Sequence, residues 1–302
     1  MRTLRTRIPS TRLMRTVAAV CILAASFVPV SAGVDRQGQP EATTRPTTQP
    51  TTQPVPSFTI ATYNVCYPMR NYAEAVKTIR DADADIVCLQ EAAGKFQPYI
   101  RKHLRKQYPH MIFRGRMGVG ILSKHPIGLW RHVRPGPGRN DKLICMTKID
   151  GKTFVIANLH LEPTVPDANG GLSGAIRQYL QKEKIRKKEM QRVLKALPKG
   201  KPVILVGDMN SLPGSAALTL IRDHGLADSY QDANPKGLND PTWHHNHNGT
   251  ELAYRLDYIY HDETFKTLTS KIVKSDASDH YLVLGRFRWT PEKEPTTKPA
   301  DR

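Results

Sequence analysis

The chain has 302 residues, of which 39% are hydrophobic, and its 45 Lys and Arg residues outnumber its 27 Asp and Glu residues, for a formal net charge of +18. Its four cysteines are too few and too widely spaced for a disulfide-stabilised scaffold. The basic excess favours an anionic partner, whether nucleic acid, a phosphorylated small molecule or an anionic lipid surface, although solubility alone would also account for it.

Residues 1–32 have the layout of a secretory signal peptide. Five arginines and no acidic residue precede the apolar run VAAVCILAASFVPV at 17–30, and small residues follow it at the position where a signal peptidase would cut. A membrane anchor is the alternative, but the run is shorter than the roughly 20 apolar residues that a bilayer-spanning helix needs. We predict a mature protein that begins near Gly33 and is exported, periplasmic or extracellular, with no stable membrane span.

Low-complexity segments flank a single predicted domain. Residues 33–57 repeat the motif TTQP, and residues 290–302 have a similar composition rich in Pro, Thr and Lys. Such segments have too little apolar surface to offset the entropy lost on ordering, so we predict a disordered linker and a disordered tail. The catalytic domain is predicted over residues 58–289, a length that allows one large core.

The domain alternates short apolar runs with segments of helical periodicity. In chain order we predict a strand at 58–65, a helix at 71–83, strands at 85–91, 117–123, 143–149 and 153–161, a helix at 174–198, a strand at 201–210, a helix at 215–225, and strands at 256–261 and 281–289. Strands that alternate with helices indicate a mixed α/β domain. The basic face of the helix at 174–198 is typical of a solvated outer helix.

Polar side chains recur where these strands begin or end. They are Asn64, Glu91, Asn158 and His160, Asp208 and Asn210, Asp257, and Asp279 and His280. One such residue is usually a turn, cap or surface residue, and GDMNSLPGS at 207–215 alone would fit a strand followed by a turn. Six strand termini in one domain that each present such groups indicate a shared site.

The residue types limit the chemistry of that site. Carboxylates with an amide oxygen are hard ligands that suit Mg²⁺ or Mn²⁺, and no Cys/His cluster has the spacing of a zinc site. Histidines beside carboxylates favour proton transfer or stabilisation of a charged phosphoryl group. The sequence contains neither a G-x-x-x-x-G-K-[ST] phosphate loop nor a G-x-S-x-G elbow. Metal-assisted hydrolysis of an anionic ester by water remains.

The ordered motifs TYNV, LQE, GVGILSKHPI, NLHLE, GDMNSLPGS, RLDYIY and SDH resemble those of the endonuclease/exonuclease/phosphatase superfamily, which has a deoxyribonuclease-like fold. The resemblance runs from about residue 58 to residue 288. It implies a four-layer α/β/β/α sandwich, in which two facing mixed β-sheets are flanked by helices, with the active site at one end of the sheets.

The resemblance also implies a metal side of the site. Asn64 matches the asparagine beside metal and phosphate, Glu91 matches the principal metal ligand, and Asp279 matches a carboxylate on the metal side. The implied cofactor is Mg²⁺, with Mn²⁺ as the alternative, and the number of ions is left open.

Five further residues match catalytic positions of the superfamily. His160 matches the histidine that contacts the scissile phosphate, and Asp208 matches the residue that orients or deprotonates the attacking water. Asn210 matches a donor to the phosphoryl oxygens. Asp257 matches the aspartate that orients the final histidine, which is His280.

Two stretches are not assigned by the resemblance. Arg139 or Lys142 is a candidate phosphate contact where relatives often carry a tyrosine or an arginine. The segment WHHNHNG at 243–249 is predicted as a polar surface loop, with an extra metal or substrate contact as the alternative. Its three histidines are His244, His245 and His247.

We therefore expect an exported, metal-dependent nuclease or phosphodiesterase that acts on a phosphate-ester substrate, with nucleic acid as one candidate. A phosphatase or a phospholipase resembling the bacterial sphingomyelinases is the alternative within the same chemistry, but the sequence shows no obvious exposed hairpin rich in aromatic residues. A non-catalytic binding module is a third hypothesis, which eight retained polar residues disfavour. No protein partner is implied, and a monomer is expected.

Overall fold

The computed structural model describes residues 56–66, 71–164, 171–247 and 250–291. The predicted signal peptide lies outside these residues, as do nearly all of the predicted linker and tail. No helix within the described residues combines the length and apolar character needed to cross a membrane. The described residues from 56 to 164 and from 177 to 291 belong to one compact unit, and residues 171–176 belong to a separate one.

One six-stranded sheet has the strand order β13-β14-β1-β2-β4-β3. Its strands are β1 (Phe58–Asn64), β2 (Ile86–Gln90), β3 (His110–Arg114), β4 (Val119–Ser123), β13 (Phe265–Val273) and β14 (Leu282–Trp289). β1 and β2 are parallel, and the other pairs are antiparallel. The sheet is therefore mixed, and its parallel pair carries the TYNV and LQE motifs to the same end.

The second six-stranded sheet has the order β5-β6-β7-β8-β12-β9. Its strands are β5 (Ile127–Val133), β6 (Lys142–Ile149), β7 (Lys152–His160), β8 (Val203–Asp208), β9 (Ala227–Asp228) and β12 (Asp257–His261). Here β7 and β8 are the parallel pair. A separate two-stranded hairpin joins β10 (Trp243–His247) to β11 (Thr250–Tyr254).

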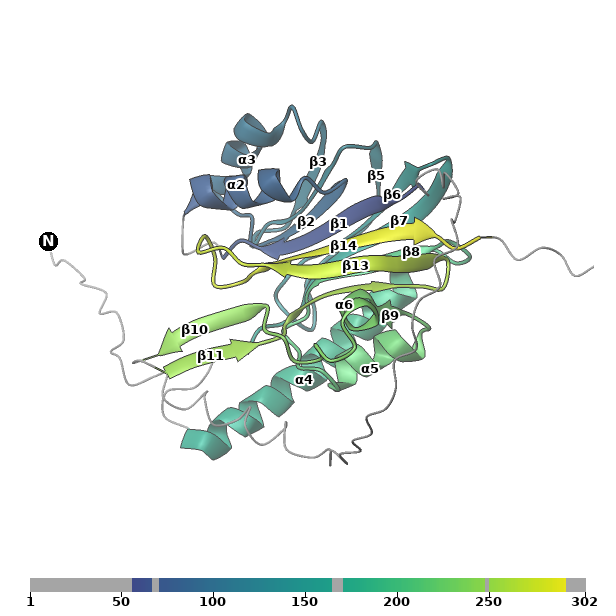
Figure 1. The fold of residues 1–302 in the computed structure, drawn as a ribbon. Helices are drawn as coiled ribbons and strands as arrows, with labels where there is room; N and C mark the ends of the chain where they lie inside the picture. Colours follow the sequence, from purple (N-terminus) through teal and green to yellow (C-terminus); the bar gives the residue numbers. More distant parts are fainter. Residues whose placement is uncertain (1–55, 67–70, 165–170, 248–249, 292–302) are drawn as a thin grey trace, which may run out of the picture. The chain divides into compact units, whose positions relative to one another are not determined.

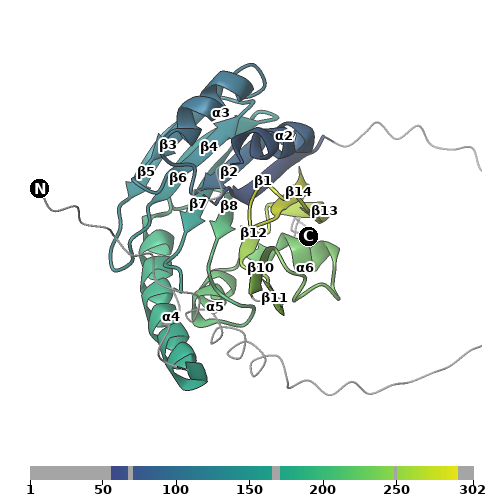
Figure 2. The same cartoon turned by 90° about the vertical axis from the view of Figure 1, so that its left-hand side faces the viewer.

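Helices cover the outer face of each sheet (Figures 1 and 2). They are α2 (Tyr72–Ala82), α3 (Phe96–Leu104), α4 (Gly171–Ala196) and α5 (Ala216–Asp223), whereas α6 (Ser229–Ala233) packs against β13 of one sheet and β9 and β12 of the other. One apolar cluster packs α2 and α3 on the first sheet, a second packs α4 and α5 on the other, and a third fills the space between the sheets. The predicted four-layer α/β/β/α sandwich is confirmed.

The strands predicted from apolar runs are the central ones, because they are covered on both faces. β2, β4, β8 and β12 are buried at every position. The unpredicted strands β3, β5, β9 and β13 lie at the edges of the sheets, and helices α3 and α6 were also not predicted. The boundaries of the predicted elements differ from the observed ones by up to three residues.

The prediction of a loop at 243–249 was wrong for residues 243–247, which form β10. In the hairpin, the Trp243 ring lies 5.8 Å from that of Tyr254 and 6.0 Å from that of His245, with interplanar angles of 11° in both cases. Trp243 of β10 pairs with Tyr254 of β11 across the hairpin, and this aromatic cross-strand pair stabilises a strand in a segment whose other residues are polar. The chain therefore contains a hairpin with two half-buried aromatic residues, Trp243 and Tyr254, in mostly polar strands.

Candidate active site

Sheet register places three of the candidate catalytic residues in one row. Asp208 of β8 is paired with His160 of β7 on one side and with Asp257 of β12 on the other. Paired residues project to the same face of a sheet, so the three side chains face the other sheet together. All three are almost completely buried. The row lies at the end of β7 and β8 and the start of β12.

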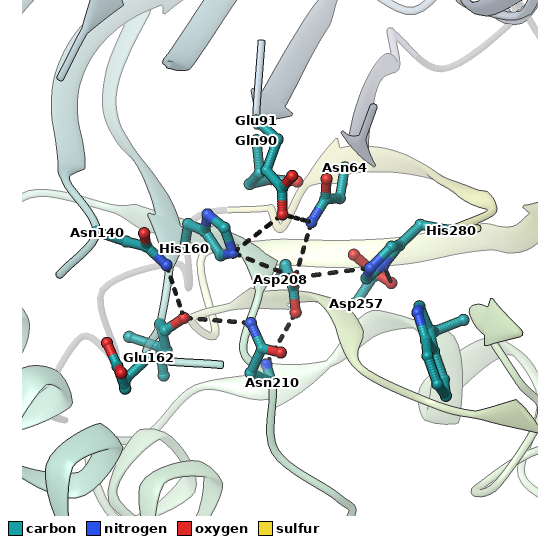
Figure 3. A network of polar contacts seen from close by, with 12 residues as sticks. Asn64, Gln90, Glu91, Asn140, His160, Glu162, Asp208, Asn210, Asp257 and His280 are labelled. Carbon is teal, nitrogen blue, oxygen red and sulfur yellow. Dashed lines mark hydrogen bonds and ion pairs between the residues drawn. The ribbon is translucent and has the colours of Figure 1, made fainter. Parts of the chain in front are cut away.

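The other sheet contributes Asn64 and Glu91 at the ends of the parallel pair β1 and β2. The Asn64 side-chain amide donates to Asp208 Oδ2 over 2.9 Å and to Glu91 Oε1 over 3.3 Å. One amide group thus links carboxylates that come from different sheets (Figure 3). This contact brings both sheets to a single site, as the motif order implied.

Asp208 is held at both carboxylate oxygens. Its Oδ1 accepts from the backbone N–H of Asn210 over 2.9 Å, and its Oδ2 accepts from Asn64. Asn210 has a φ of +49°, and a Cβ on Gly207 would lie 2.0 Å from the backbone oxygen of Leu159. The GDMN sequence therefore needs its glycine so that β8 can approach β7 closely, and its asparagine accepts the left-handed turn.

Burial raises the pKa of Asp208 to about 7. The charge of His280 opposes this effect, the charge of Asp257 adds to it, and the hydrogen bonds from Asn64 and Asn210 oppose it. Asp208 is therefore a carboxyl group that changes protonation near neutral pH, as a general base requires.

His280 and Asp257 form a buried ion pair. His280 Nδ1 lies 2.8 Å from Asp257 Oδ2, which also accepts from the Thr242 hydroxyl over 2.7 Å. Burial disfavours protonation of His280, but the charges of Asp257 and Asp208 outweigh it and raise its pKa to about 10. With Nδ1 bound to Asp257, the other nitrogen, Nε2, faces Asp208 Oδ2 at 3.8 Å. His280 is therefore an imidazolium that presents one N–H to the site.

His160 has the opposite protonation state. Burial, together with the positive charges of His280, Lys142 and Arg139, lowers its pKa to about 3. Its Nε2 lies 3.6 Å from Asp208 Oδ2 and 3.8 Å from Glu91 Oε1, whereas its buried Nδ1 has no hydrogen-bond partner in the described part of the chain. The site thus combines a neutral imidazole and a charged one on either side of a carboxylate.

Two sets of side chains are candidates for holding a metal ion. One ligand atom each of Asp208, Asp257 and His280 lies within 4.8 Å of the others. However, Asp257 Oδ2 and His280 Nδ1 are already bound to each other, and a protonated His280 repels a cation. Glu91 fits a hard cation better, because its carboxylate is 21% exposed beside this cluster.

Local backbone geometry fixes the position of Glu91. Its φ is +58°, and the next residue, Ala92, donates its N–H to the backbone oxygen of Gly118 over 2.9 Å. A Cβ on Gly118, whose φ is +70°, would lie 2.2 Å from the backbone oxygen of Ala92. The glycine of the GVGILS motif is therefore required for the turn that carries Glu91.

Asn64 and Asp279, which the resemblance places on the metal side, bind other protein groups in the structure. The Asn64 side-chain oxygen accepts from the backbone N–H of Cys66 over 3.0 Å, while its amide nitrogen faces Glu91. Asp279 Oδ2 accepts from the indole N–H of Trp243 over 2.9 Å. Their assignment to the metal side therefore stays a prediction, whereas Glu91 lies directly against the catalytic cluster.

Several buried polar residues that the motif analysis did not assign support the site. Gln90 donates to the Asn158 side-chain oxygen over 2.7 Å, and the Asn158 amide donates to the backbone oxygens of Leu89 and Gly120. These bonds tie β7 to the opposite sheet immediately before His160. A polar residue inside an apolar run, as at Asn158, is the sequence signal that identifies such a bridge.

A second buried network holds the segment after β7. The backbone oxygen of Leu161 accepts from the side-chain amides of Asn140 and Asn210, each over 3.2 Å. Glu162 accepts from the backbone N–H of Arg139 over 3.0 Å and from Lys182 over 2.6 Å. The segment 134–141 and helix α4 are therefore fixed against the edge of the site.

This network separates the two candidate phosphate contacts. Lys142 is 2% exposed, and its ammonium group binds the Glu189 carboxylate and the backbone oxygen of Asn140. Arg139 has an exposed side chain whose Nε lies 3.9 Å from Glu162 Oε2. Of the two, only Arg139 is accessible to a substrate.

Comparison with known proteins agrees with this architecture. A model of the Endonuclease/Exonuclease/phosphatase family matches residues 61–280. A search of curated protein sequences finds no match.

Three solved structures show the same fold. The structure of D. rerio TDP2 complexed with single strand DNA product is 18% identical with a TM-score of 0.60, and the match covers 77% of this chain and 99% of that one. An endonuclease/exonuclease/phosphatase from Beutenbergia cavernae DSM 12333 is 19% identical, with a TM-score of 0.58 and coverage of 77% and 72%. Another from Bacteroides vulgatus is 16% identical, with a TM-score of 0.58 and coverage of 78% and 100%.

Proposed function

This chain belongs to the endonuclease/exonuclease/phosphatase family, and we propose that it is a metal-dependent phosphodiesterase that cleaves its substrate with an activated water. The observation that carries the proposal is the buried Asp208 carboxylate between the neutral imidazole of His160 and the charged imidazole of His280. Groups whose surroundings push their pKa values apart are suited to act as acid and base in one reaction.

Asp208 accepts the proton of the attacking water in this proposal. Its pKa of about 7 makes the ionised form available at neutral pH while leaving it basic enough to take a proton. The hydrogen bonds from Asn64 and Asn210 hold both oxygens in place. Their fixed direction reduces the reorganisation needed when the water is bound.

The two histidines act on the phosphoryl group. His280 keeps a proton on Nε2, because Asp257 binds its Nδ1 and stabilises the charge. Its N–H donates to a phosphoryl oxygen on which negative charge develops. His160 is neutral and offers Nε2 as a further donor from the other side of Asp208, and a second amide N–H of Asn210 is also available there.

The proposed cofactor is Mg²⁺, with Mn²⁺ as the alternative, bound at Glu91. A hard divalent cation at this position supplies charge neutralisation for the phosphoryl oxygens. The Asn64 amide donates a hydrogen bond to the Glu91 carboxylate. Asn64 would therefore orient Glu91 as a metal ligand. A metal-side role for Asp279 rests on the sequence resemblance alone.

Nucleic acid is the proposed substrate class. Without the five arginines of the predicted signal peptide, 40 Lys and Arg residues stand against 27 Asp and Glu residues, and this net charge of +13 favours a polyanion. The similar TDP2 structure contains a single-stranded DNA product. The aromatic hairpin of Trp243, His245 and Tyr254 favours a second candidate, a phospholipid substrate, because such rings also suit a membrane interface. Hydrolysis of oligonucleotides and of phospholipid vesicles, measured side by side, separates the two.

We also propose that the protein is exported after cleavage near Gly33. The support is the basic, apolar and small-residue pattern of residues 1–32. Amino-terminal sequencing of exported protein tests this proposal, and membrane-bound material that retains Met1 would contradict it.

The central test is hydrolysis of bis(4-nitrophenyl) phosphate by the parent and by Asp208→Asn, with and without chelator. We expect chelator to abolish activity, and Asp208→Asn to lower turnover by about 10²–10⁴ while a thermal melt shows a folded protein. Asp262→Asn is the matched control, because Asp262 caps the other end of β8 by accepting from the Val203 N–H. Full activity in folded Asp208→Asn, or in the parent with excess chelator, would remove the proposal.

A further inference from the structure

A cationic pocket lies between the edge strand β5 and helix α4. It has a volume of about 460 Å³, and four positively charged side chains line it. These residues, which we call the basic pocket, are Arg131, Arg134, Arg192 and Lys195. No acidic side chain lines the pocket.

The four charges of the basic pocket are not neutralised within the described chain. All four side chains are exposed, and none forms an ion pair with another described residue. The neighbouring His132 is already bound, since its Nε2 lies 2.7 Å from Asp141 Oδ1. Four like charges in one concavity repel each other, so an anion bound there would be favoured.

The basic pocket opens at the same end of the sheet as the active site. Val133 of β5 pairs with Lys142 of β6, and the next residue of β6, Leu143, pairs with Asn158 of β7. One strand, β6, therefore lies between the pocket strand β5 and the strand β7 that carries His160. The pocket lies on the face of the sheet that α4 covers, whereas His160 faces the other sheet, so a substrate bound at both sites would have to pass around the end of β6.

One chain segment, residues 134–141, connects the pocket to the site. It begins at Arg134, which lines the pocket, and it ends beside Asn140, whose amide donates to the backbone oxygen of Leu161. At its middle it lies on α4, because a Cβ on Gly136 would be 3.2 Å from Arg192 Nη1. The exposed Arg139 lies on this segment between the two sites, although its guanidinium also faces Glu162 at 3.9 Å.

An exposed aromatic residue, Trp130, immediately precedes Arg131 of the basic pocket in β5. A bulge in the β5–β6 register between Leu129 and Arg131 leaves Trp130 without a paired residue, and Trp130 is 48% exposed. Bulges redirect side chains at sheet edges. An exposed ring beside phosphate-binding cations is the combination that single-stranded nucleic acid uses, with a base stacked on the ring and phosphates on the cations.

We propose that the basic pocket binds the phosphates that flank the scissile bond in a single-stranded nucleic acid, with Trp130 stacking on an unpaired base. The inference rests on the proposed function and narrows it to polynucleotides. A concave pocket favours a flexible chain over a flat membrane, because a strand can insert successive phosphates among converging side chains.

The test measures binding of a 5′-fluorescein 12-nucleotide oligothymidylate by fluorescence anisotropy in chelator, at several KCl concentrations. The pocket variant carries Arg131→Gln, Arg134→Gln, Arg192→Gln and Lys195→Gln. The matched control carries Arg101→Gln, Lys102→Gln, Arg105→Gln and Lys106→Gln, which remove four charges from a second pocket. That pocket lies at the opposite end of its sheet, near the pair of His110 with Ser123.

We expect the pocket variant to raise Kd about tenfold or more at low salt and to flatten the slope of log K against log salt by up to about 3. The control should change Kd by about twofold or less, because distant charges are screened. Trp130→Ala should raise Kd without changing the salt slope. Equal losses in the pocket variant and the control, or an unchanged Kd and slope in the pocket variant, would overturn the inference.

Two further measurements separate this inference from the proposed function. Hydrolysis of bis(4-nitrophenyl) phosphate by the parent tests the proposed function with a substrate too small to need the pocket. If the parent does not hydrolyse it, the proposed function is contradicted, whereas the oligonucleotide-binding result still stands. Anionic vesicles of phosphatidylglycerol and phosphatidylcholine are the competing ligand. Vesicle binding that needs the pocket and Trp130, with no oligonucleotide binding, would overturn the nucleic-acid assignment.

Discussion

Replacement of Asp257 by Asn should remove the proton from His280 at neutral pH. The two side chains form a buried pair at 2.8 Å. Burial alone would lower the pKa of His280, but the nearby carboxylates raise it from its ordinary 6.5 to about 10. This difference corresponds to about 5 kcal/mol in favour of the imidazolium. The amide removes the larger of the two carboxylate contributions and leaves burial unchanged, so His280 in Asp257→Asn should lose its proton near or below neutral pH.

The free energy of unfolding of the parent should then fall as the pH rises above neutral, and that of Asp257→Asn should not. A group whose pKa is raised by folding contributes stability that is fully present below its unfolded pKa, here 6.5, and is lost as the pH rises through about 10. His280 should therefore lower the free energy of unfolding of the parent by about 3.5 kcal/mol between pH 7 and pH 10. In Asp257→Asn this decline should be absent.

Urea unfolding from pH 6 to pH 10 in chelator, with NMR of the histidine side-chain nitrogens, measures both effects. Asp262→Asn, the same change at the other end of β12, should keep the pH dependence of the parent. If His280 of the parent titrates near 6.5, or if the parent and Asp257→Asn unfold with parallel pH profiles, the ion pair is not what sets the charge of this imidazole.

Three other substitutions test other parts of the site. Glu91→Gln should raise the Mg²⁺ concentration needed for half-maximal activity, because a neutral amide attracts a hard cation weakly; an unchanged requirement would place the metal elsewhere. Glu189→Gln should lower the free energy of unfolding, measured in urea, by about 3–5 kcal/mol, because it leaves the buried Lys142 without its charged partner. Replacement of both residues by Met should restore much of the lost stability. Gly118→Ala should lower the free energy of unfolding by more than about 2 kcal/mol and lower activity, because its Cβ would clash with the backbone that follows Glu91. Gly151→Ala is the control: Gly151 also has a left-handed backbone but lies in open space, so this change should lower the free energy of unfolding by only about 1 kcal/mol. Equal losses in the two variants would rule out the clash.

The division between predicted and unpredicted strands follows from which faces are covered. All eight predicted strands are interior members of the two sheets. Four of them, β2, β4, β8 and β12, are buried at every position, and the other four contain runs of at least four buried positions, so their sequences include continuous apolar runs. The edge strand β13, by contrast, mixes buried and exposed positions along FKTLTSKIV. Such a segment has the composition of a surface loop, and only pairing with β14 makes it a strand.

The polar residues of the site were predictable because strand ends are visible in the sequence, but their contacts were not. The motif order placed Asn64, Glu91 and Asp208 at neighbouring strand ends. Nothing in the sequence determines that the Asn64 amide nitrogen rather than its oxygen faces the carboxylates. Likewise, Lys142 and Arg139 were equivalent candidates until the fold placed Glu189 of α4 beneath Lys142. Side-chain direction depends on tertiary neighbours that no local pattern encodes.

The two ends of the sandwich have opposite energetic roles. At the end away from the site, the ring centroids of Phe58 and Phe154 are 5.5 Å apart, and those of Phe265 and Trp289 are 4.8 Å apart. A cluster of aromatic rings therefore joins the sheets at this end. At the site end, burial opposes ionisation of Asp208 and raises its pKa from 3.8 to about 7, so the contribution of this group to the stability of the fold is lost as the pH rises from about 4 to about 7. The same burial makes Asp208 basic enough to accept a proton. The apolar end therefore offsets the cost of the buried carboxyl groups at the site end, and it joins the same two sheets that the Asn64 bridge connects.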